Sequence, residues 1–395
     1  MARAVAAHSA LLSQLAARSP VAASHASAAD RLHAAILPVN PLRAAVARGA
    51  SSGRSHVSRV NVSASAATEP SSKDLQAKFG KDGVSFDDGL GGLPRVILAD
   101  ASGSTAEVYL YGACTTSWKL PSGEDLLFVR PDAVFTGAKP ISGGIPHCFP
   151  QFGPGAMQQV RCAALFTDAP FTDAVFTGAK PISGGIPHCF PQFGPGAMQQ
   201  HGFARNLTWE VEAAEGGASP SLTLALSDNE YSRAMWDFAF KATFKISLSD
   251  GKLETVFTVT NTDSKPFSFT TALHSYFRAA IGGVKVTGLK GAKSLNKDPD
   301  PTNPIAGVEE RDEVTFPGFV DCMYLNTPQE LVLDNGLGRK LAIRNKGWTD
   351  AVVWSPHLTM PACYLDFVCV ENAKLSEVEL QAGQTWTAEQ ELVAL

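Results

Sequence analysis

The chain of 395 residues lacks the sequence patterns of several large protein classes. No apolar run reaches the 18 or more residues that cross a bilayer, so we expect no membrane span. The seven cysteines include no Cys-x-x-Cys pair, and no histidines or cysteines stand at metal-ligand spacing, so we expect reduced thiols and no metal site. The chain also has no Walker loop, no Gly-x-Gly-x-x-Gly fingerprint after a strand and no Gly-x-Ser-x-Gly elbow.

The first 68 residues have almost no acidic side chains. They contain seven arginines, no lysine and a single acid, Asp30. Arginine-rich, serine-rich and acid-poor composition is typical of organelle transit peptides. We predict that residues 1–68 form a disordered transit peptide, and the serine and valine content favours chloroplast over mitochondrion. The alternative is a disordered tail without a targeting function.

Residues 69–395 carry an excess of negative charge. Without the first 68 residues, Lys and Arg number 26 and Asp and Glu number 37, a net charge of about −11. This balance does not favour nucleic acid as a partner. The length suits one large all-β domain, which we expect to be monomeric.

Alternating apolar and polar residues predict antiparallel strands rather than helices. The clearest run covers residues 238–248, and a Ser-Asp-Gly turn at 249–251 leads into a second strand at 253–260, which together predict a hairpin. Asp334-Asn335-Gly336 predicts another hairpin, and a further strand is expected at 364–371. No sustained helical pattern follows residue 90. We therefore predict an all-β fold, a large antiparallel sandwich.

A perfect internal copy interrupts this pattern. Residues 132–159 (copy one) and 173–200 (copy two) are identical over DAVFTGAKPISGGIPHCFPQFGPGAMQQ. Old structural repeats keep only the positions that packing demands, so the duplication is recent or an error in the gene model. Its glycines and prolines predict an ordered loop of the kind that lines a site. A single sandwich has room for only one copy of this loop. We expect copy two to occupy that place and copy one to be extruded to the surface.

Few residues after position 90 are suited to acid/base chemistry. His274 follows a predicted strand on a face of small residues, and Glu371 ends an otherwise apolar strand face, where burial would raise its pKa towards the range of a general base. Asp321 lies among apolar residues and is a candidate hydroxyl acceptor. Each residue also has a structural interpretation. His274 could be a hydrogen-bonded structural histidine, the strand could have reached solvent at Glu371, and Asp321 could lie in a solvated turn.

Five cationic side chains are candidate ligands for an anionic group, because Arg and Lys bind phosphate oxygens. They are Lys119, Arg130, Lys180 (or its copy, Lys139), Arg205 and Arg278. Each could equally be a solvated surface charge.

Several motifs, taken in order, resemble the glucose-6-phosphate 1-epimerases of the aldose 1-epimerase superfamily, in particular their plant branch. The resemblance extends over about residues 75–395. It rests on GACTTSWK at 112–119, LLFVRPDAVF at 126–135, KPISGGIPHCFPQFG at 180–194, QHGFARNLTWE at 200–210, ALHSYF at 272–277 and CVENA at 369–373.

The resemblance implies a galactose-mutarotase-like β-supersandwich that interconverts the α and β anomers of glucose 6-phosphate. It implies His274 as the general acid and Glu371 as the general base, with no metal or organic cofactor. His201 and Asp321 would hold sugar hydroxyls, and Arg205 would support the site or approach the phosphate.

The sequence of this chain differs from the family pattern at one position. Many members have arginine directly before Gly-Gly-Ile-Pro, where this chain has Ser183 and its copy Ser142. Phosphate recognition would then depend on other cations, of which Arg130 and Lys180 are our first candidates. Two alternatives stay open: a non-catalytic carbohydrate-binding protein with the same fold, and a product inactivated by the duplication.

Overall fold

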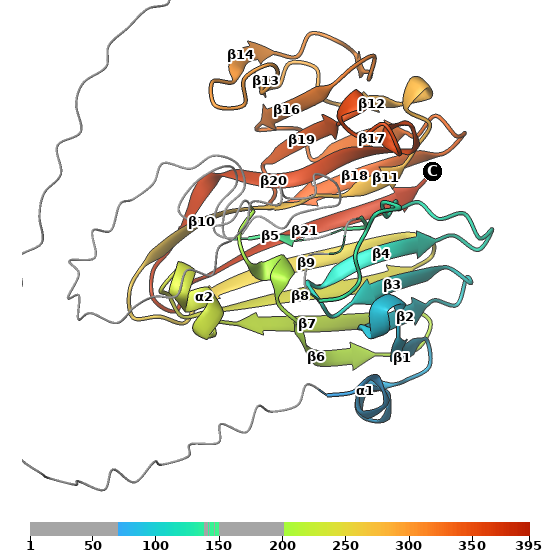
Figure 1. Cartoon of the computed structure of the whole chain (residues 1–395), viewed down its shortest axis with the longest axis vertical. Helices are drawn as coiled ribbons and strands as arrows, with labels where there is room; N and C mark the ends of the chain where they lie inside the picture. The colour runs from blue at the N-terminus through green and yellow to red at the C-terminus, as the bar shows by residue number, and fades with distance from the viewer. Residues whose placement is uncertain (1–69, 138–140, 142, 146, 150–200) are drawn as a thin grey trace, which may run out of the picture. The chain divides into compact units, whose positions relative to one another are not determined.

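The computed structural model describes residues 70–137, 141, 143–145, 147–149 and 201–395. The expected transit peptide and copy two lie outside the described residues. The described part consists mainly of antiparallel strands, which confirms the predicted fold class (Figure 1). No helix in this part of the chain is long and apolar enough to cross a membrane.

The strands form three sheets. A four-stranded sheet has the order β1 (Val84–Asp88), β2 (Pro94–Ala99), β3 (Thr105–Tyr109), β4 (Cys114–Lys119). An eight-stranded sheet has the order β14 (Ile305–Val308), β13 (Lys293–Asn296), β16 (Val320–Leu325), β19 (Asp350–Ser355), β20 (Phe367–Leu380), β10 (Phe267–Leu273), β5 (His147–Cys148), and β11 (Tyr276–Arg278) also pairs with β20. A nine-stranded sheet has the order β15 (Glu313–Val314), β12 (Lys285–Thr287), β17 (Glu330–Asp334), β18 (Lys340–Lys346), β21 (Thr385–Ala394), β9 (Lys252–Asn261), β8 (Phe240–Ser249), β7 (Ser221–Ser227), β6 (Glu210–Glu215).

The helices of the described part are short. They are α1 (Ser72–Phe79), α2 (Glu230–Met235) and the 3-10 turns η1 (Leu90–Gly92), η2 (Ala204–Asn206), η3 (Ile281–Gly283), η4 (His357–Thr359) and η5 (Tyr364–Asp366). Asn229 caps α2: its side chain accepts from the backbone N–H of Ser232, and the Ser232 hydroxyl accepts from the backbone N–H of Asn229. This reciprocal cap stabilises a helix too short to show a periodic pattern.

The alternation in the sequence matches the burial of the long strands. Every second residue of β8 and β9 is buried, and the two strands pair as the predicted hairpin, with their bounds within two residues of those expected. The hairpin predicted around Asn335 is also confirmed, because β17 pairs with β18. The strand expected at 364–371 begins instead at Phe367. Residues 364–366 form η5, where Leu365 is exposed.

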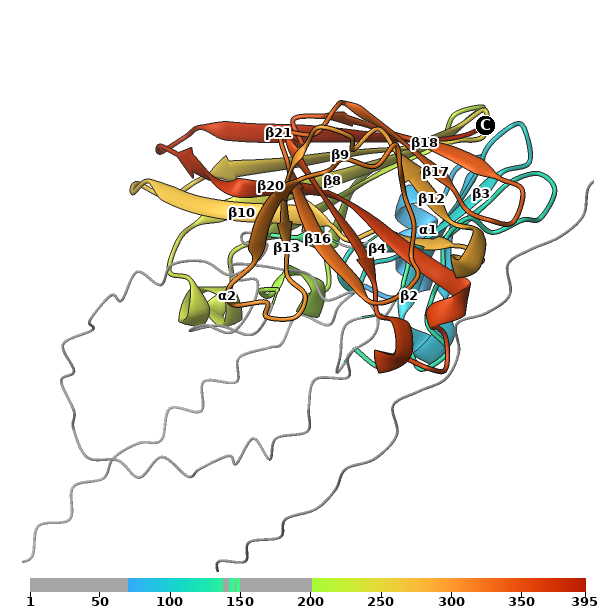
Figure 2. The same cartoon turned by 90° about the horizontal axis from the view of Figure 1, so that it is seen from above.

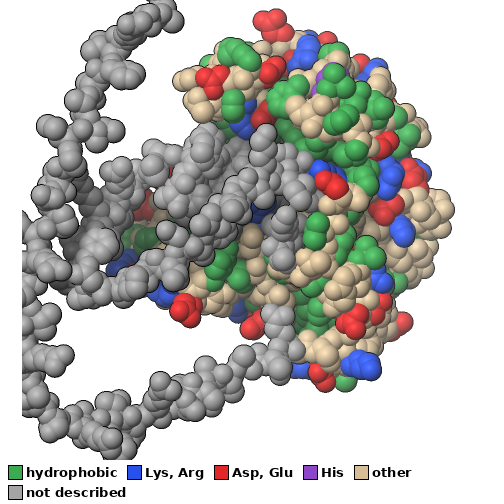
Figure 3. Space-filling view, viewed as in Figure 1, with side chains coloured by type: hydrophobic (Ala, Val, Ile, Leu, Met, Phe, Trp, Pro, Cys, Tyr) green, Lys and Arg blue, Asp and Glu red, His purple; other side chains and the backbone are tan. Residues whose placement is uncertain are grey.

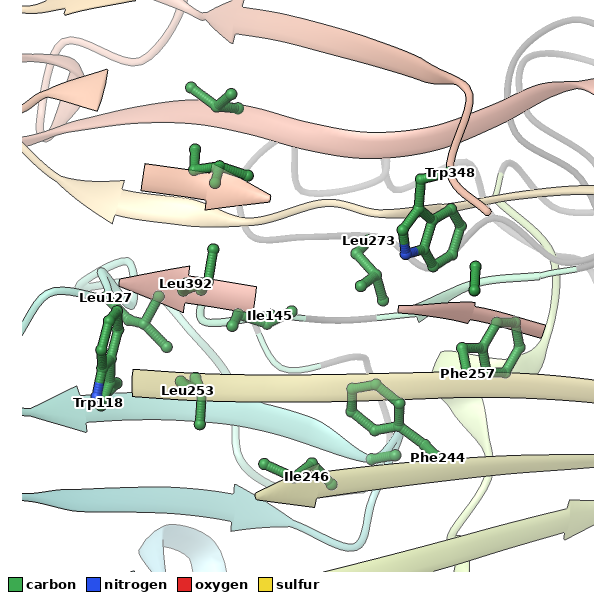
Figure 4. Close-up of a cluster of buried hydrophobic side chains, with 14 of the residues drawn as sticks. Trp118, Leu127, Ile145, Phe244, Ile246, Leu253, Phe257, Leu273, Trp348 and Leu392 are labelled. Carbon is green, nitrogen blue, oxygen red and sulfur yellow. The ribbon is translucent and has the colours of Figure 1, made fainter. Parts of the chain in front are cut away.

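The two larger sheets face each other across an apolar core. Figure 2 shows β21, β9 and β8 in one layer, with β20 and β10 in the layer beneath it. Phe257 and Leu253 of the nine-stranded sheet and Leu273 of the eight-stranded sheet belong to one buried cluster (Figure 4). On the face drawn in Figure 3, acidic and basic side chains are interspersed over the described surface.

Copy one supplies part of this core, whereas copy two, which we expect to fill this place, lies outside the described residues. Ile145 pairs with Thr115 and is fully buried, and Phe149 packs edge-on against Phe269 with ring centroids 4.7 Å apart. Gly144 has φ +83°, and a Cβ there would lie 1.6 Å from the Thr115 carbonyl oxygen, so the position needs glycine. Copy one follows closely on residues 126–130 in the chain, and Val129 pairs with Gly143 of copy one.

Candidate active site

His274 and Glu371 are neighbours across a gap in the strand ladder. β10 ends at the pair Leu273↔Asn372, and β11 resumes along β20 at Tyr276↔Cys369. The register is unchanged across the gap, so His274 lies opposite Glu371, and its Nδ1 is 3.2 Å from Glu371 Oε1. The two residues are 7% and 2% exposed. The chain thus places a buried imidazole and a buried carboxylate together, a combination suited to proton transfer.

Aromatic rings hold the imidazole in place. Tyr276 stacks on the His274 ring with centroids 4.9 Å apart, and Trp354 of β19 lies edge-on at 5.9 Å. Behind Tyr276, the ring of Phe367 stacks at 4.9 Å. A side chain enclosed in this way has few alternative rotamers, so its orientation is fixed before any ligand arrives.

Burial, reinforced by two cations, keeps the imidazole of His274 neutral. Burial lowers its pKa to about 3, and the charges of Arg205 and Lys297 act in the same direction. The His201 ring lies edge-on at 6.3 Å, and its pKa is also lowered well below the ordinary value, first by burial, then by Arg205, His274 and Lys297. The two histidines therefore lie in one buried environment that feels the charges of Arg205 and Lys297.

Asp321 lies beside Lys297 at the same end of the eight-stranded sheet. The Lys297 Nζ is 3.0 Å from Asp321 Oδ1 and 2.9 Å from Oδ2, and Lys297 is buried. Asp321 pairs in register with Trp354, the residue that contacts His274. A carboxylate held in this way can still accept a hydrogen bond from a sugar hydroxyl.

Arg130 presents unused hydrogen-bond donors next to a cleft. It is 6% exposed; its Nη2 is 2.5 Å from Asp132 Oδ2, while Nε and Nη1 have no hydrogen-bond partner among the described residues. The cleft, of about 320 Å³, is lined by Arg130, Pro131, Asp132 and residues 359–363. Burial raises the pKa of Tyr276 well above its ordinary value, and the charge of Arg130 opposes this rise.

Residues 94–159 and 164–393 match the family described as aldose 1-epimerase. The chain belongs to this family.

Relatives of the epimerase agree with this assignment. Two proteins named "Putative glucose-6-phosphate 1-epimerase" are each 29% identical to it, one from Cenchrus ciliaris and one from Escherichia coli. The first alignment covers 75% of this chain and 83% of the relative; the second covers 72% and 84%.

Solved structures show the same fold. The crystal structure of "a putative mutarotase (YeaD)" from Salmonella typhimurium has a TM-score of 0.62 at 25% identity, covering 79% of this chain and 93% of that chain. Slr1438 from Synechocystis sp. PCC 6803 has a TM-score of 0.58 at 16% identity, covering 80% and 96%, and supports the fold alone.

The epimerase brings together most of the residues selected from its sequence. His274, Glu371, His201, Arg205 and Asp321 belong to one neighbourhood, and Arg130 borders the adjoining cleft. Lys180 and its copy Lys139 lie outside the described residues. Glu371 is buried, so the alternative that its strand has reached solvent there is wrong.

Sequence reasoning missed Lys297, Trp354 and Cys369. No local pattern marks Lys297, because it reaches the site through the pairing of β13 with β16. Cys369 lies on the same strand face as Glu371, and within the described part of the chain the ligand atoms of His274, Cys369 and Glu371 lie within 4.8 Å of one another. Burial raises the pKa of the Cys369 thiol well above its ordinary value, so this set holds a protonated thiol, a weak metal ligand.

Proposed function

We propose that this epimerase is a monomeric glucose-6-phosphate 1-epimerase, which interconverts the α and β anomers of glucose 6-phosphate and related hexose 6-phosphates. The observation that carries the proposal is the buried His274–Glu371 pair, with its 3.2 Å contact, beside the cations Arg205 and Lys297. The pair supplies acid and base, and the cations suit a phosphorylated sugar.

The proposed reaction moves two protons and breaks one ring bond. Glu371 takes the proton from the C1 hydroxyl while His274 protonates the ring oxygen, and the bond between C1 and that oxygen breaks. The resulting aldehyde rotates about its C1–C2 bond. The C5 hydroxyl then adds to the other face of C1, His274 takes back its proton, and Glu371 returns its proton to the new C1 hydroxyl.

Substrate binding would prepare His274 for its role as an acid. In the unliganded site burial, and after it the positive charges of Arg205 and Lys297, disfavour a protonated imidazole and lower its pKa. A phosphate dianion near these cations offsets their charge and raises the pKa of His274 towards neutrality. A neutral hexose cannot do this, so phosphate contributes to catalysis as well as to binding.

Arg130 is the proposed replacement for the arginine that many family members have before Gly-Gly-Ile-Pro. Val129 pairs with Gly143, so Arg130 follows a residue that contacts this motif directly. Its Nε and Nη1 have no hydrogen-bond partner among the described residues, and each could donate singly to a phosphate oxygen. Lys180 remains a second candidate ligand.

Exchange spectroscopy by NMR tests the activity. The folded protein should accelerate exchange between the anomers of glucose 6-phosphate above the rate with inorganic phosphate alone, and Glu371→Gln should abolish the acceleration while leaving sugar-phosphate binding intact. Binding without acceleration by the wild-type protein would identify a non-catalytic carbohydrate-binding protein instead.

We also propose that residues 1–68 direct the chain to the chloroplast. The support is their composition, with seven arginines, no lysine and one acid. Fusing these residues to a fluorescent protein tests it: plastid fluorescence supports the proposal, and mitochondrial or diffuse fluorescence contradicts it.

A further inference from the structure

A group of polar side chains crosses the otherwise apolar core directly behind the His274–Glu371 pair. Gln390 of β21 donates from Nε2 to Asn372 Oδ1 at 2.5 Å and to Ser275 Oγ at 3.4 Å. Its Oε1 accepts from the Thr255 hydroxyl at 3.3 Å. All four residues are at most 1% exposed.

The two partners of Gln390 on the eight-stranded sheet are the chain neighbours of the acid/base residues. Ser275 follows His274, and Asn372 follows Glu371. Successive side chains of an extended strand point to opposite faces of a sheet. One amide nitrogen of Gln390 therefore contacts, from behind, both chain segments that carry the pair.

These contacts lie at the gap in the ladder between β10 and β11. Leu273 pairs with Asn372 before the gap, and Tyr276 pairs with Cys369 after it. Within the gap, the Val370 N–H donates to the Ser275 carbonyl at a long 3.3 Å. The backbone also bends here, since the Ser275 N–H donates to the Leu273 carbonyl at 3.0 Å. The local separation of the two segments thus depends less on the ladder than elsewhere along β20.

Gln390 itself is held by the opposite sheet. It pairs in register with Thr255 of β9 and with Asn345 of β18. Its neighbour on the same strand face is Leu392, and the surrounding cluster includes Leu253, Phe257 and Leu273 (Figure 4). A buried amide in such surroundings is costly unless its hydrogen bonds are made, and a connected polar network fixes one arrangement of the parts it joins.

We propose that Gln390 is a positioning residue, which sets the distance between His274 and Glu371 by binding Ser275 and Asn372 from the opposite sheet. The proposal rests on the function proposed above. Acid/base pairs need placement within about 0.5 Å, and a displacement of about 1 Å can cost about 100-fold in rate. Two residues proposed to bind substrate are held by other partners: Lys297 donates to Asp321, and Arg130 donates to Asp132.

The test compares two buried amides that both join the nine-stranded sheet to β20. Gln390→Met keeps the length of the side chain and removes its hydrogen bonds. The matched control is Asn261→Leu, because Asn261 is also fully buried and its Nδ2 donates to the Leu380 carbonyl at the far end of β20. Both variants should unfold more easily than the wild type. Gln390→Met should lower kcat about tenfold with KM within twofold, whereas Asn261→Leu should leave both within twofold.

The assay distinguishes failure of the proposed function from failure of the positioning role. If the wild type does not accelerate anomer exchange, the proposed function fails. If the wild type is active and Gln390→Met matches Asn261→Leu in kcat, the positioning role fails. Should Gln390→Met not fold, Ser275→Ala removes the weaker contact alone and should lower kcat about threefold at unchanged KM. Retention of full kcat in that variant overturns the proposal.

Discussion

Acidification should destabilise this epimerase through His274. The folded protein holds the imidazole neutral, with a pKa of about 3, whereas in the unfolded chain the pKa is about 6.5. Below pH 6.5 the unfolded chain binds a proton that the folded chain excludes. The stabilising effect is therefore complete above pH 6.5 and is lost as the pH falls towards 3.

The magnitude follows from the pH interval. The unfolded imidazole is protonated below its pKa of about 6.5, and pH 5 lies about 1.5 pH units below that value. At about 1.4 kcal/mol per pH unit, lowering the pH from 8 to 5 reduces the free energy of unfolding by about 2 kcal/mol. His201, whose pKa is also lowered well below its ordinary value, adds a decrease of the same sign. Carboxylates whose folded pKa values stay below about 5 contribute little in this interval, because their unfolded pKa values lie near 4.

Urea unfolding at pH 8 and pH 5 measures this effect. In the wild type the free energy of unfolding should fall between the two pH values, and in His274→Gln the fall should be smaller by about 2 kcal/mol. His357→Gln is the matched control, because His357 is partly exposed and lies outside the acid/base pair. An identical decrease in the wild type and in His274→Gln would refute the reasoning.

Three further predictions concern the site and the duplication. Arg130→Met should raise KM for glucose 6-phosphate at least tenfold and leave the rate with glucose within threefold, measured by the same exchange assay; an equal loss for both sugars would remove Arg130 from phosphate recognition. Binding of glucose 6-phosphate should take up a proton near pH 7, visible as a buffer-dependent calorimetric enthalpy, and a buffer-independent enthalpy would argue against coupling to His274. Removing residues 160–200 should give a chain at least as stable and as active, and a lower unfolding temperature would show that the second copy contributes to the fold.

The sequence predicted the long strands well and the assembly of the site only in part. The alternation in β8 and β9 is visible because each strand buries one face, and the six-residue α2 escaped notice because it spans fewer than two turns. Motif resemblance selected His274 and Glu371, but their contact depends on the register between distant strands. Lys297 carries no local signal, since its place in the site comes from the pairing of β13 with β16. The order of the two copies could not be predicted, because identical sequences have identical propensities.

The place that copy one occupies between β4 and β10 has a consequence for mutagenesis. Copy two carries the same residues, so a substitution in copy one at Ile145 or Phe149 leaves an unaltered competitor in the same polypeptide at high effective concentration. Exchange of the copies would then conceal the cost of the substitution. Single-site variants of this loop would seem tolerant, and only paired changes in both copies, or changes made in the shortened chain, would reveal what each side chain contributes.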